Sequence, residues 1–161
     1  MDTSDPEIIF NEFQVCNHCN YFDLNVNDII RIDNRGLKEI ESIINKVKTK
    51  GKNNEYDCIL GLSGGIDSSF LALKVKEFKL RPLVVHVDAG WNSELAVYNI
   101  QKVIDYCDFD LHTEVIDWEV MKELQLAYFK SGICNQDVPQ DHVFFASLYH
   151  FATKNNIKYI L

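Results

Sequence analysis

Several common signals are missing from this sequence of 161 residues. No apolar run approaches the roughly 20 residues of a membrane-spanning helix, and the first residues lack a signal-peptide pattern. The five cysteines are odd in number and scattered, which suits a reducing compartment better than a disulfide scaffold. These absences lead us to expect a cytoplasmic protein with no membrane partner.

Basic residues are also in short supply. Sixteen Lys and Arg stand against 24 Asp and Glu, for a formal net charge of −8, whereas a nucleic-acid-binding face normally needs clustered cations. We therefore expect no nucleic-acid partner, although a local patch or an appended domain could supply the charge. Internal repeats and low-complexity segments are absent too. The length and the hydrophobic fraction of 47% are those of an ordinary globular domain.

One glycine-containing stretch, residues 60–69, organises the rest of the chain. An apolar run leads into it and an amphipathic run leaves it, which predicts a strand, a tight turn and a helix. That arrangement points backbone N–H groups at a phosphate. Gly64 and Gly65 can take positive φ and leave room for an anion. Side chains that could contact the phosphates or a neutralising Mg²⁺ accompany them: Ser63, Asp67, Ser68 and Ser69.

Two well-known phosphate loops are excluded by what this stretch lacks. The Walker pattern needs a Lys-Ser/Thr pair after its last glycine, and Gly65 is followed by Ile66 and Asp67. The dinucleotide fingerprint G-x-G-x-x-G has no match. The pattern S-G-G-x-D-S instead resembles the PP-loop of the ATP pyrophosphatases, which split ATP into AMP and pyrophosphate. The alternative, a Gly/Ser-rich turn that binds nothing, fits six fixed positions between a strand and a helix poorly.

The chain divides into two predicted parts. Residues 1–36 form an irregular N-terminal segment with a C-x-x-C knuckle and a short strand over 8–10, and residues 37–161 form an α/β domain that binds ATP. Apolar periodicity predicts alternating elements: helices over 36–49, 68–79, 93–106, 117–130 and 139–155, and strands over 56–62, 81–87, 109–116 and 157–161. The fold class is therefore α/β, a doubly wound parallel sheet of the adenine nucleotide alpha hydrolase-like (PP-loop) type, with ligands at the carboxyl ends of the strands.

The carboxyl end of the second predicted strand supplies further candidates. Backbone groups near Val87 and the Asp88 carboxylate could reach adenine or ribose, although Asp88 could equally close an Asx turn. His86 is more typical of a satisfied sheet histidine than of a catalytic base, and Trp91 of half-buried packing. With the loop, these positions give our predicted ATP-binding set: Leu62, Ser63, Gly64, Gly65, Asp67, Ser68, Ser69, Val87 and Asp88.

The polar segment 131–142 precedes the last predicted helix at the same edge of the sheet. Loops at this edge carry substrate specificity, so Asp137, Asp141 and His142 are our candidate substrate residues. A solvated loop with a carboxylate at the helix start explains the segment equally well.

Cys16 and Cys19 form the C-x-x-C knuckle. Such a knuckle presents two thiolates to one Zn²⁺, but a structural zinc site needs four ligands. His18 lies inside the knuckle, where its side chain would usually point away from the metal. From these residues alone, a zinc site and a pair of free thiols are equally supported.

Most of the chain resembles a narrower family, the N-acetyl sugar amidotransferases of surface-polysaccharide (lipopolysaccharide) biosynthesis. The resemblance rests on residues 1–6, 15–19, 56–69, 88–93, 141–142 and 157–161. It implies an ATP-dependent C–N ligase that uses MgATP to adenylate the acetamido group of an N-acetyl sugar for attack by ammonia, with Asp67 as the catalytic residue. It also implies a glutamine amidotransferase partner that supplies the ammonia.

The chain departs from that family at both ends. The family usually carries an earlier C-x-x-C, which would complete a four-cysteine zinc site, and it continues past the last strand with a glycine-containing loop and more helices. We therefore expect a fragment whose own activity is in doubt, and a knuckle that has been trimmed or has lost its metal. Two alternatives stay open: another PP-loop enzyme, such as a tRNA-thiolating enzyme or an amide synthetase, and a non-catalytic ATP-binding module.

Overall fold

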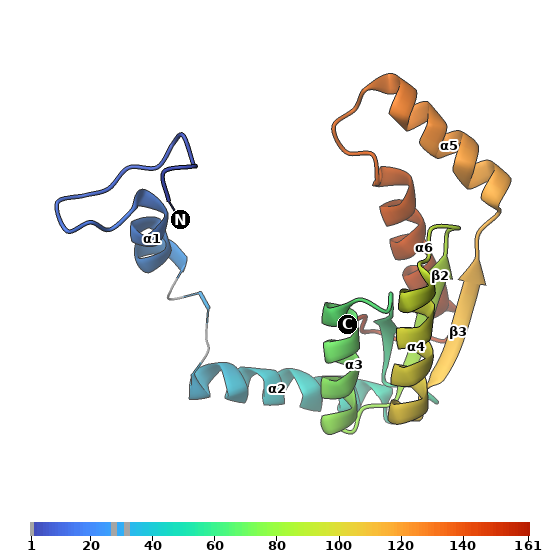
Figure 1. Cartoon of the computed structure of the whole chain (residues 1–161). Helices are drawn as coiled ribbons and strands as arrows, with labels where there is room; N and C mark the ends of the chain where they lie inside the picture. The colour runs from blue at the N-terminus through green and yellow to red at the C-terminus, as the bar shows by residue number, and fades with distance from the viewer. Residues whose placement is uncertain (1, 27–28, 31–32) are drawn as a thin grey trace. The chain divides into compact units, whose positions relative to one another are not determined.

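The computed structural model describes residues 2–26, 29–30 and 33–161 (Figure 1). The chain forms two compact units, Met1–Ile43 and Ile44–Leu161, and the boundary falls inside helix α2 (Asn34–Gly51).

The first unit has little regular structure, as the sequence predicts. It contains the short helix α1 (Asn17–Tyr21) and the π-helical turn η1 (Phe22–Val26). The strand expected over 8–10 is reduced to one antiparallel bridge between Phe10 and Cys16. The Asn17 side chain fastens this loop, because its amide oxygen accepts from the Ile9 N–H at 3.1 Å and its Nδ2 donates to the Glu7 carbonyl.

Three parallel strands form the centre of the second unit, in the order β1 (Cys58–Gly61), β2 (Pro82–Asp88) and β3 (Asp110–Val115). The first two strands are almost entirely apolar and buried, because both faces of the sheet are covered. The third strand lies at the edge and exposes much of its length.

The segment after the last helix lies on the other side of β1. Ile160 forms a parallel bridge to Ile59, whose N–H donates to the Tyr159 carbonyl while its own carbonyl accepts from the Leu161 N–H. The fourth strand predicted over 157–161 is therefore in the expected place, but it is reduced to a single bridge.

Helices cover both faces of the sheet (Figure 1). On one face α3 (Ile66–Glu77) packs beside α4 (Glu94–Cys107), and on the other α6 (Val138–Lys154) contacts β1 and β2, with α5 (Trp118–Ser131) beside α6. Each face has its own apolar core, one around Leu60, Ala72 and Val84 and the other around Ile59, Val85 and Phe151. This arrangement confirms the predicted doubly wound parallel sheet.

An ion pair between the buried Asp57 and the half-exposed Arg81 lies at the amino end of the sheet. Asp57 is 4% exposed and accepts three hydrogen bonds from Arg81, from its backbone N–H at 2.9 Å and from Nε and Nη2 at 3.2 and 2.6 Å. Arg81 also donates to the carbonyls of Gly51 and Asn54. The hydrogen bond to Asp57 raises the pKa of the Arg81 guanidinium. The pair therefore ties the end of α2 to the starts of two strands.

No helix in the described ranges is long and apolar enough to cross a membrane.

Candidate functional site

The glycine loop, residues 62–65, connects β1 to α3 at the point where the order of strands in the sheet reverses. From β1 the chain proceeds to β2 and β3 on one side, whereas Ile160 lies on the other side of β1. Ligands of open α/β sheets bind at the carboxyl edge beside such a switch point. The loop that follows β1 therefore occupies the ligand-binding position of this fold.

Gly64 gives the loop its shape. Its φ is +76°, and a Cβ added there would lie 2.2 Å from the carbonyl oxygen of Ala96 in α4. Glycine is thus required both by the backbone conformation and by the close approach of a helix. The sequence suggested positive φ for Gly65 as well, but Gly65 has φ −75° and is instead the N-cap of α3.

The start of α3 is open to a ligand. Its N-cap is a glycine that makes no side-chain cap, so the first backbone N–H groups of the helix are left for an anion. Ser68 Oγ accepts from the Ser63 N–H at 3.2 Å and lies 3.1 Å from Ser63 Oγ, so these hydroxyls brace the loop. The Asp67 carboxylate, in the first turn, is exposed and has no hydrogen-bond or ion-pair partner among the described residues.

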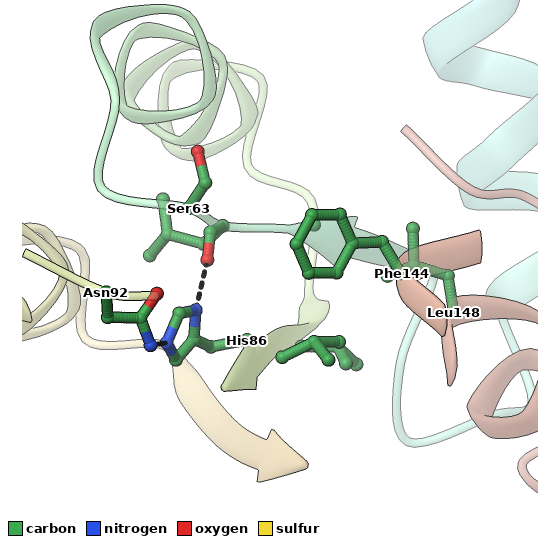
Figure 2. Close-up of a pocket in the computed structure, with 9 residues that line it drawn as sticks. Ser63, His86, Asn92, Phe144 and Leu148 are labelled. Carbon is green, nitrogen blue, oxygen red and sulfur yellow. Dashed lines mark hydrogen bonds between the residues drawn. The ribbon is translucent and has the colours of Figure 1, made fainter. Parts of the chain in front are cut away.

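A pocket of about 160 Å³ opens between the loop and α6 (Figure 2). Its wall is mostly apolar, with backbone groups at the ends of β1 and β2. A slot of this kind suits a flat heteroaromatic ring. The lining residues are Gly61, Leu62, Ser63, Val85, His86, Val87, Asn92, Phe144 and Leu148.

Some of the predicted ATP-binding residues line the pocket. Leu62, Ser63 and Val87 line it, but Asp88 does not. Asp88 Oδ1 accepts from the Gly90 N–H at 2.9 Å, which is the Asx turn that the sequence left open as the alternative. Gly64, Gly65 and Ser69 instead line a separate groove between α3 and α4.

His86 lies at the floor of the pocket with both ring nitrogens occupied. It is 7% exposed, with Nδ1 2.9 Å from the Leu62 carbonyl oxygen and Nε2 3.0 Å from Asn92 Nδ2. An amide nitrogen can only donate, so Nε2 accepts and the Nδ1–H donates to Leu62. The ring is a satisfied sheet histidine, as the sequence predicts, and has no lone pair free for base catalysis.

The turn after β2 is held by α5. Gly90 has φ +88°, and a Cβ there would lie 2.4 Å from the Trp118 ring. Trp91 meets the same ring edge-on with centroids 5.3 Å apart and donates from Nε1 to the buried Gln125. Trp91 is nevertheless 56% exposed, so it packs on its neighbours and still presents a face to solvent.

The candidate substrate residues lie around the start of α6. Asp137 precedes the helix and makes no side-chain cap, and Asp141 lies in its first turn. Both are exposed, as is His142. These three residues precede Phe144, which lines the pocket, by seven, three and two residues respectively. No hydrogen bond joins them to the glycine loop within the described part of the chain.

The cysteine knuckle lacks the ligands of a metal site. Cys16 Sγ accepts from the Cys19 N–H at 3.4 Å, and this bond lowers the pKa of Cys16, whereas the hydrogen bond with Cys16 raises the pKa of Cys19. The His18 ring points to Asp5, with Nε2 2.6 Å from Oδ2. No group of three or more metal-ligating side chains occurs among the residues described. The zinc expected on Cys16 and Cys19 is therefore not supported.

Two contributors to the site were missed from sequence. Asn99 of α4 donates from Nδ2 to the Gly64 carbonyl at 3.0 Å, and Phe144 of α6 lines the pocket. The aromatic run in α6 gave no signal that one of its members faces a pocket. Asn99 carried no local signal, since its role depends on how α4 packs against the loop.

No family model matches the chain. An uncharacterized protein of Methanocaldococcus jannaschii is 42% identical over 76 residues, which are 46% of this chain and 26% of that protein. Among solved structures, the NMN synthetase of Francisella tularensis has a TM-score of 0.55 at 20% identity, over 74% of this chain and 50% of that one.

The NH3-dependent NAD synthetase of Campylobacter jejuni has a TM-score of 0.51 at 18% identity, over 76% of this chain and 54% of that one. This chain thus spans about half the length of the two solved structures and about a quarter of the archaeal protein. At such identities the likeness concerns the fold. The chain shares its α/β fold with these two synthetases.

Proposed function

We propose that this chain is the ATP-binding part of an ATP-dependent C–N ligase that releases AMP and pyrophosphate. The observation that carries the proposal is the glycine loop at the switch point, with the uncapped start of α3 on one side and an apolar pocket on the other. The two synthetases that share the fold are named for amide- or nucleotide-forming reactions, and one is described as NH3-dependent, which supports ammonia as the attacking nitrogen.

The residues present fit MgATP. The adenine ring enters the pocket beside Val87 and Phe144, while the N–H groups at the start of α3 receive the β- and γ-phosphates. Asp67 is exposed in the first turn of the same helix and would hold Mg²⁺, which would neutralise charge on the phosphates. The protein thereby contributes positioning and charge stabilisation, which are the main requirements of this reaction.

The acceptor in this proposal is the acetamido group of an N-acetyl sugar, and its support is the sequence resemblance to the amidotransferases of surface-polysaccharide synthesis. The amide oxygen attacks the α-phosphorus, and pyrophosphate leaves. Ammonia from a glutamine amidotransferase partner then adds to the activated carbon, and AMP leaves with the oxygen to give an acetamidino sugar. In this proposal the sugar would contact Asp137, Asp141 and His142. The enzyme would be cytoplasmic.

Phosphorus NMR tests the proposal. The full gene product is mixed with MgATP, ammonium and a panel of N-acetylated sugars, with Asp67→Ala as the control. We expect AMP and pyrophosphate to appear only with a particular sugar, and the rate to fall about 10²-fold or more in the variant. ADP and phosphate would contradict the proposed loop chemistry. Tight ATP binding without turnover would favour a non-catalytic module.

A further inference from the structure

A loop that binds an anion through its N–H groups must also direct its carbonyl groups away from that anion and supply them with hydrogen-bond donors. Each peptide unit carries one donor and one acceptor, and a carbonyl oxygen that faces a phosphate repels it. In the glycine loop, three carbonyl oxygens accept hydrogen bonds from within the protein: those of Leu62, Gly64 and Gly65. The last is satisfied by α3 itself, through the Ser69 N–H at 3.1 Å.

The other two carbonyls are satisfied by side chains from outside the loop. His86 in β2 donates to Leu62 at 2.9 Å, and Asn99 in α4 donates to Gly64 at 3.0 Å. These donors approach from the sheet and from the neighbouring helix. Each of these hydrogen bonds fixes the direction of one carbonyl of the loop.

The tautomer of His86 is supported by a hydrogen bond on the other ring nitrogen. Asn92 Nδ2 donates to Nε2 (Figure 2), so the ring proton lies on Nδ1, which faces the Leu62 carbonyl. Without that proton, a nitrogen lone pair would face a carbonyl lone pair in a buried site. The Leu62 carbonyl and Asn92 together favour the tautomer with its proton on Nδ1.

The Asn99 donor belongs to a surface that fits the loop closely. Ala96 and Asn99 are three residues apart and share one face of α4, where Ala96 leaves no space for a Cβ on Gly64. One helix thus fixes both the position of Gly64 and the direction of its carbonyl.

We propose that His86 and Asn99 are positioning residues that turn the carbonyls of the phosphate loop away from the bound phosphates. This inference rests on the proposed function only in requiring that the loop bind phosphates. Neither side chain touches the reacting atoms.

The test compares two probes, magnesium pyrophosphate and adenosine, by titration calorimetry on the full chain. In His86→Gln the side-chain amide lies near the former Nε2 and the donor to Leu62 is lost, whereas His86→Asn keeps a donor near the former Nδ1. Asn99→Ala removes the second donor. Gln101→Ala is the matched control, since Gln101 is exposed on α4 and bonds only to Asp105 within the described residues.

We expect His86→Gln and Asn99→Ala to weaken pyrophosphate binding about tenfold or more. The side chain of Asn99 does not line the adenine pocket, so Asn99→Ala should keep adenosine affinity within about twofold of wild type. The loss of pyrophosphate affinity in His86→Asn should be smaller than in His86→Gln, and Gln101→Ala should match wild type. Equal losses for both probes in Asn99→Ala would mean general collapse of the site and would overturn the inference, as would unchanged pyrophosphate binding in either variant.

Nitrogen NMR of the ring adds a readout that does not depend on ligands. A proton on Nδ1 of His86 is the expected result, and a proton on Nε2 would overturn the inference. Turnover is tested separately. If the variants weaken pyrophosphate binding but no sugar gives AMP, the proposed reaction is overturned and the positioning roles remain. If the wild-type protein binds no pyrophosphate, both proposals are overturned.

Discussion

At the scale of single residues, two glycines with similar backbone angles serve different purposes. Gly64 and Gly132 have φ of +76° and +70°, but a Cβ on Gly64 would collide with the Ala96 backbone, whereas a Cβ on Gly132 would meet nothing within 4 Å. Gly64 therefore combines a conformational requirement with a packing one. Gly132, the C-cap of α5, has the conformational requirement alone.

This contrast yields a prediction for the two alanine variants. Gly132→Ala should lower the free energy of unfolding by about 1 kcal/mol, the cost of a left-handed alanine. Gly64→Ala should lower it by about 3 kcal/mol or more, since the helix or the loop must also move, and should weaken pyrophosphate binding. Urea unfolding and calorimetry measure the two effects. Equal stability losses would show that the approach of α4 costs nothing.

What the sequence reveals at this scale depends on distance along the chain. The turn between the first strand and the next helix could be predicted because its pattern lies in six consecutive positions, and its binding of phosphate stays a prediction. His86 was correctly expected to be a satisfied histidine, but its partners could not be named, because Leu62 lies 24 positions away and is brought close by strand pairing. Asn99, 35 positions from Gly64, depends on the rotation of α4.

At the scale of elements, short polar side chains set the starts of two helices. Ser93 Oγ accepts from the Ala96 N–H and begins α4, and Asp117 accepts from the N–H groups of Glu119 and Val120 and begins α5. The two caps are chemically similar, but α4 also carries Asn99, which donates to a carbonyl of the glycine loop.

Removing either cap should therefore separate stability from binding. Ser93→Ala and Asp117→Ala should each lower the free energy of unfolding by about 1 kcal/mol. Only Ser93→Ala should also weaken pyrophosphate binding, since fraying of α4 loosens the contacts of Ala96 and Asn99. Urea unfolding gives the first quantity and calorimetry the second. A matching loss of affinity in Asp117→Ala would contradict the assigned role of α4.

Periodicity was sufficient to find helices α2 to α6 and the three strands of the sheet, but it missed α1 and η1 and was less informative about which face of a helix is buried. In α3, Val75 and Ala72 are buried, whereas the larger Leu71 is 36% exposed. The small side chain of Ala72 lets α4 approach, with Cys107 Sγ 3.9 Å from the Ala72 carbonyl oxygen. Such a choice depends on the neighbouring helix, and a single helix cannot reveal it.

At the scale of the whole molecule, burial links stability to alkaline pH. Burial raises the pKa of the fully buried Cys58 thiol from 9.0 to about 12, and raises that of Tyr56 from 10.0 to about 12. In the unfolded chain these groups lose their protons at their ordinary pKa values. The folded state therefore binds more protons between about pH 9 and 12, and stability must fall as the pH rises through that range.

We predict that the free energy of unfolding falls by about 1 kcal/mol per pH unit for each such group above its unfolded pKa. Cys58→Ala should reduce the slope of the free energy of unfolding against pH by the contribution of one group, whatever it does to stability at neutral pH. Cys134→Ala, at an exposed cysteine, should leave the slope unchanged. Urea unfolding at several pH values, with reductant present, measures the slopes. Equal slopes in the two variants would exclude Cys58 as the source.

The long-range pairing of β1 also affects the order in which the unit can fold during synthesis. Ile59 cannot form its bridge until Ile160 has been translated. The nearby hydrogen bond from Asn54 to the Asn156 carbonyl likewise joins positions 102 residues apart. At about 5–20 residues per second, a ribosome needs roughly 5–20 s to make the intervening segment. During that interval the apolar strand that leads into the glycine loop lacks one of its neighbours. The glycine loop is thus among the earliest parts of its unit to be translated, and its surroundings are among the last to be completed.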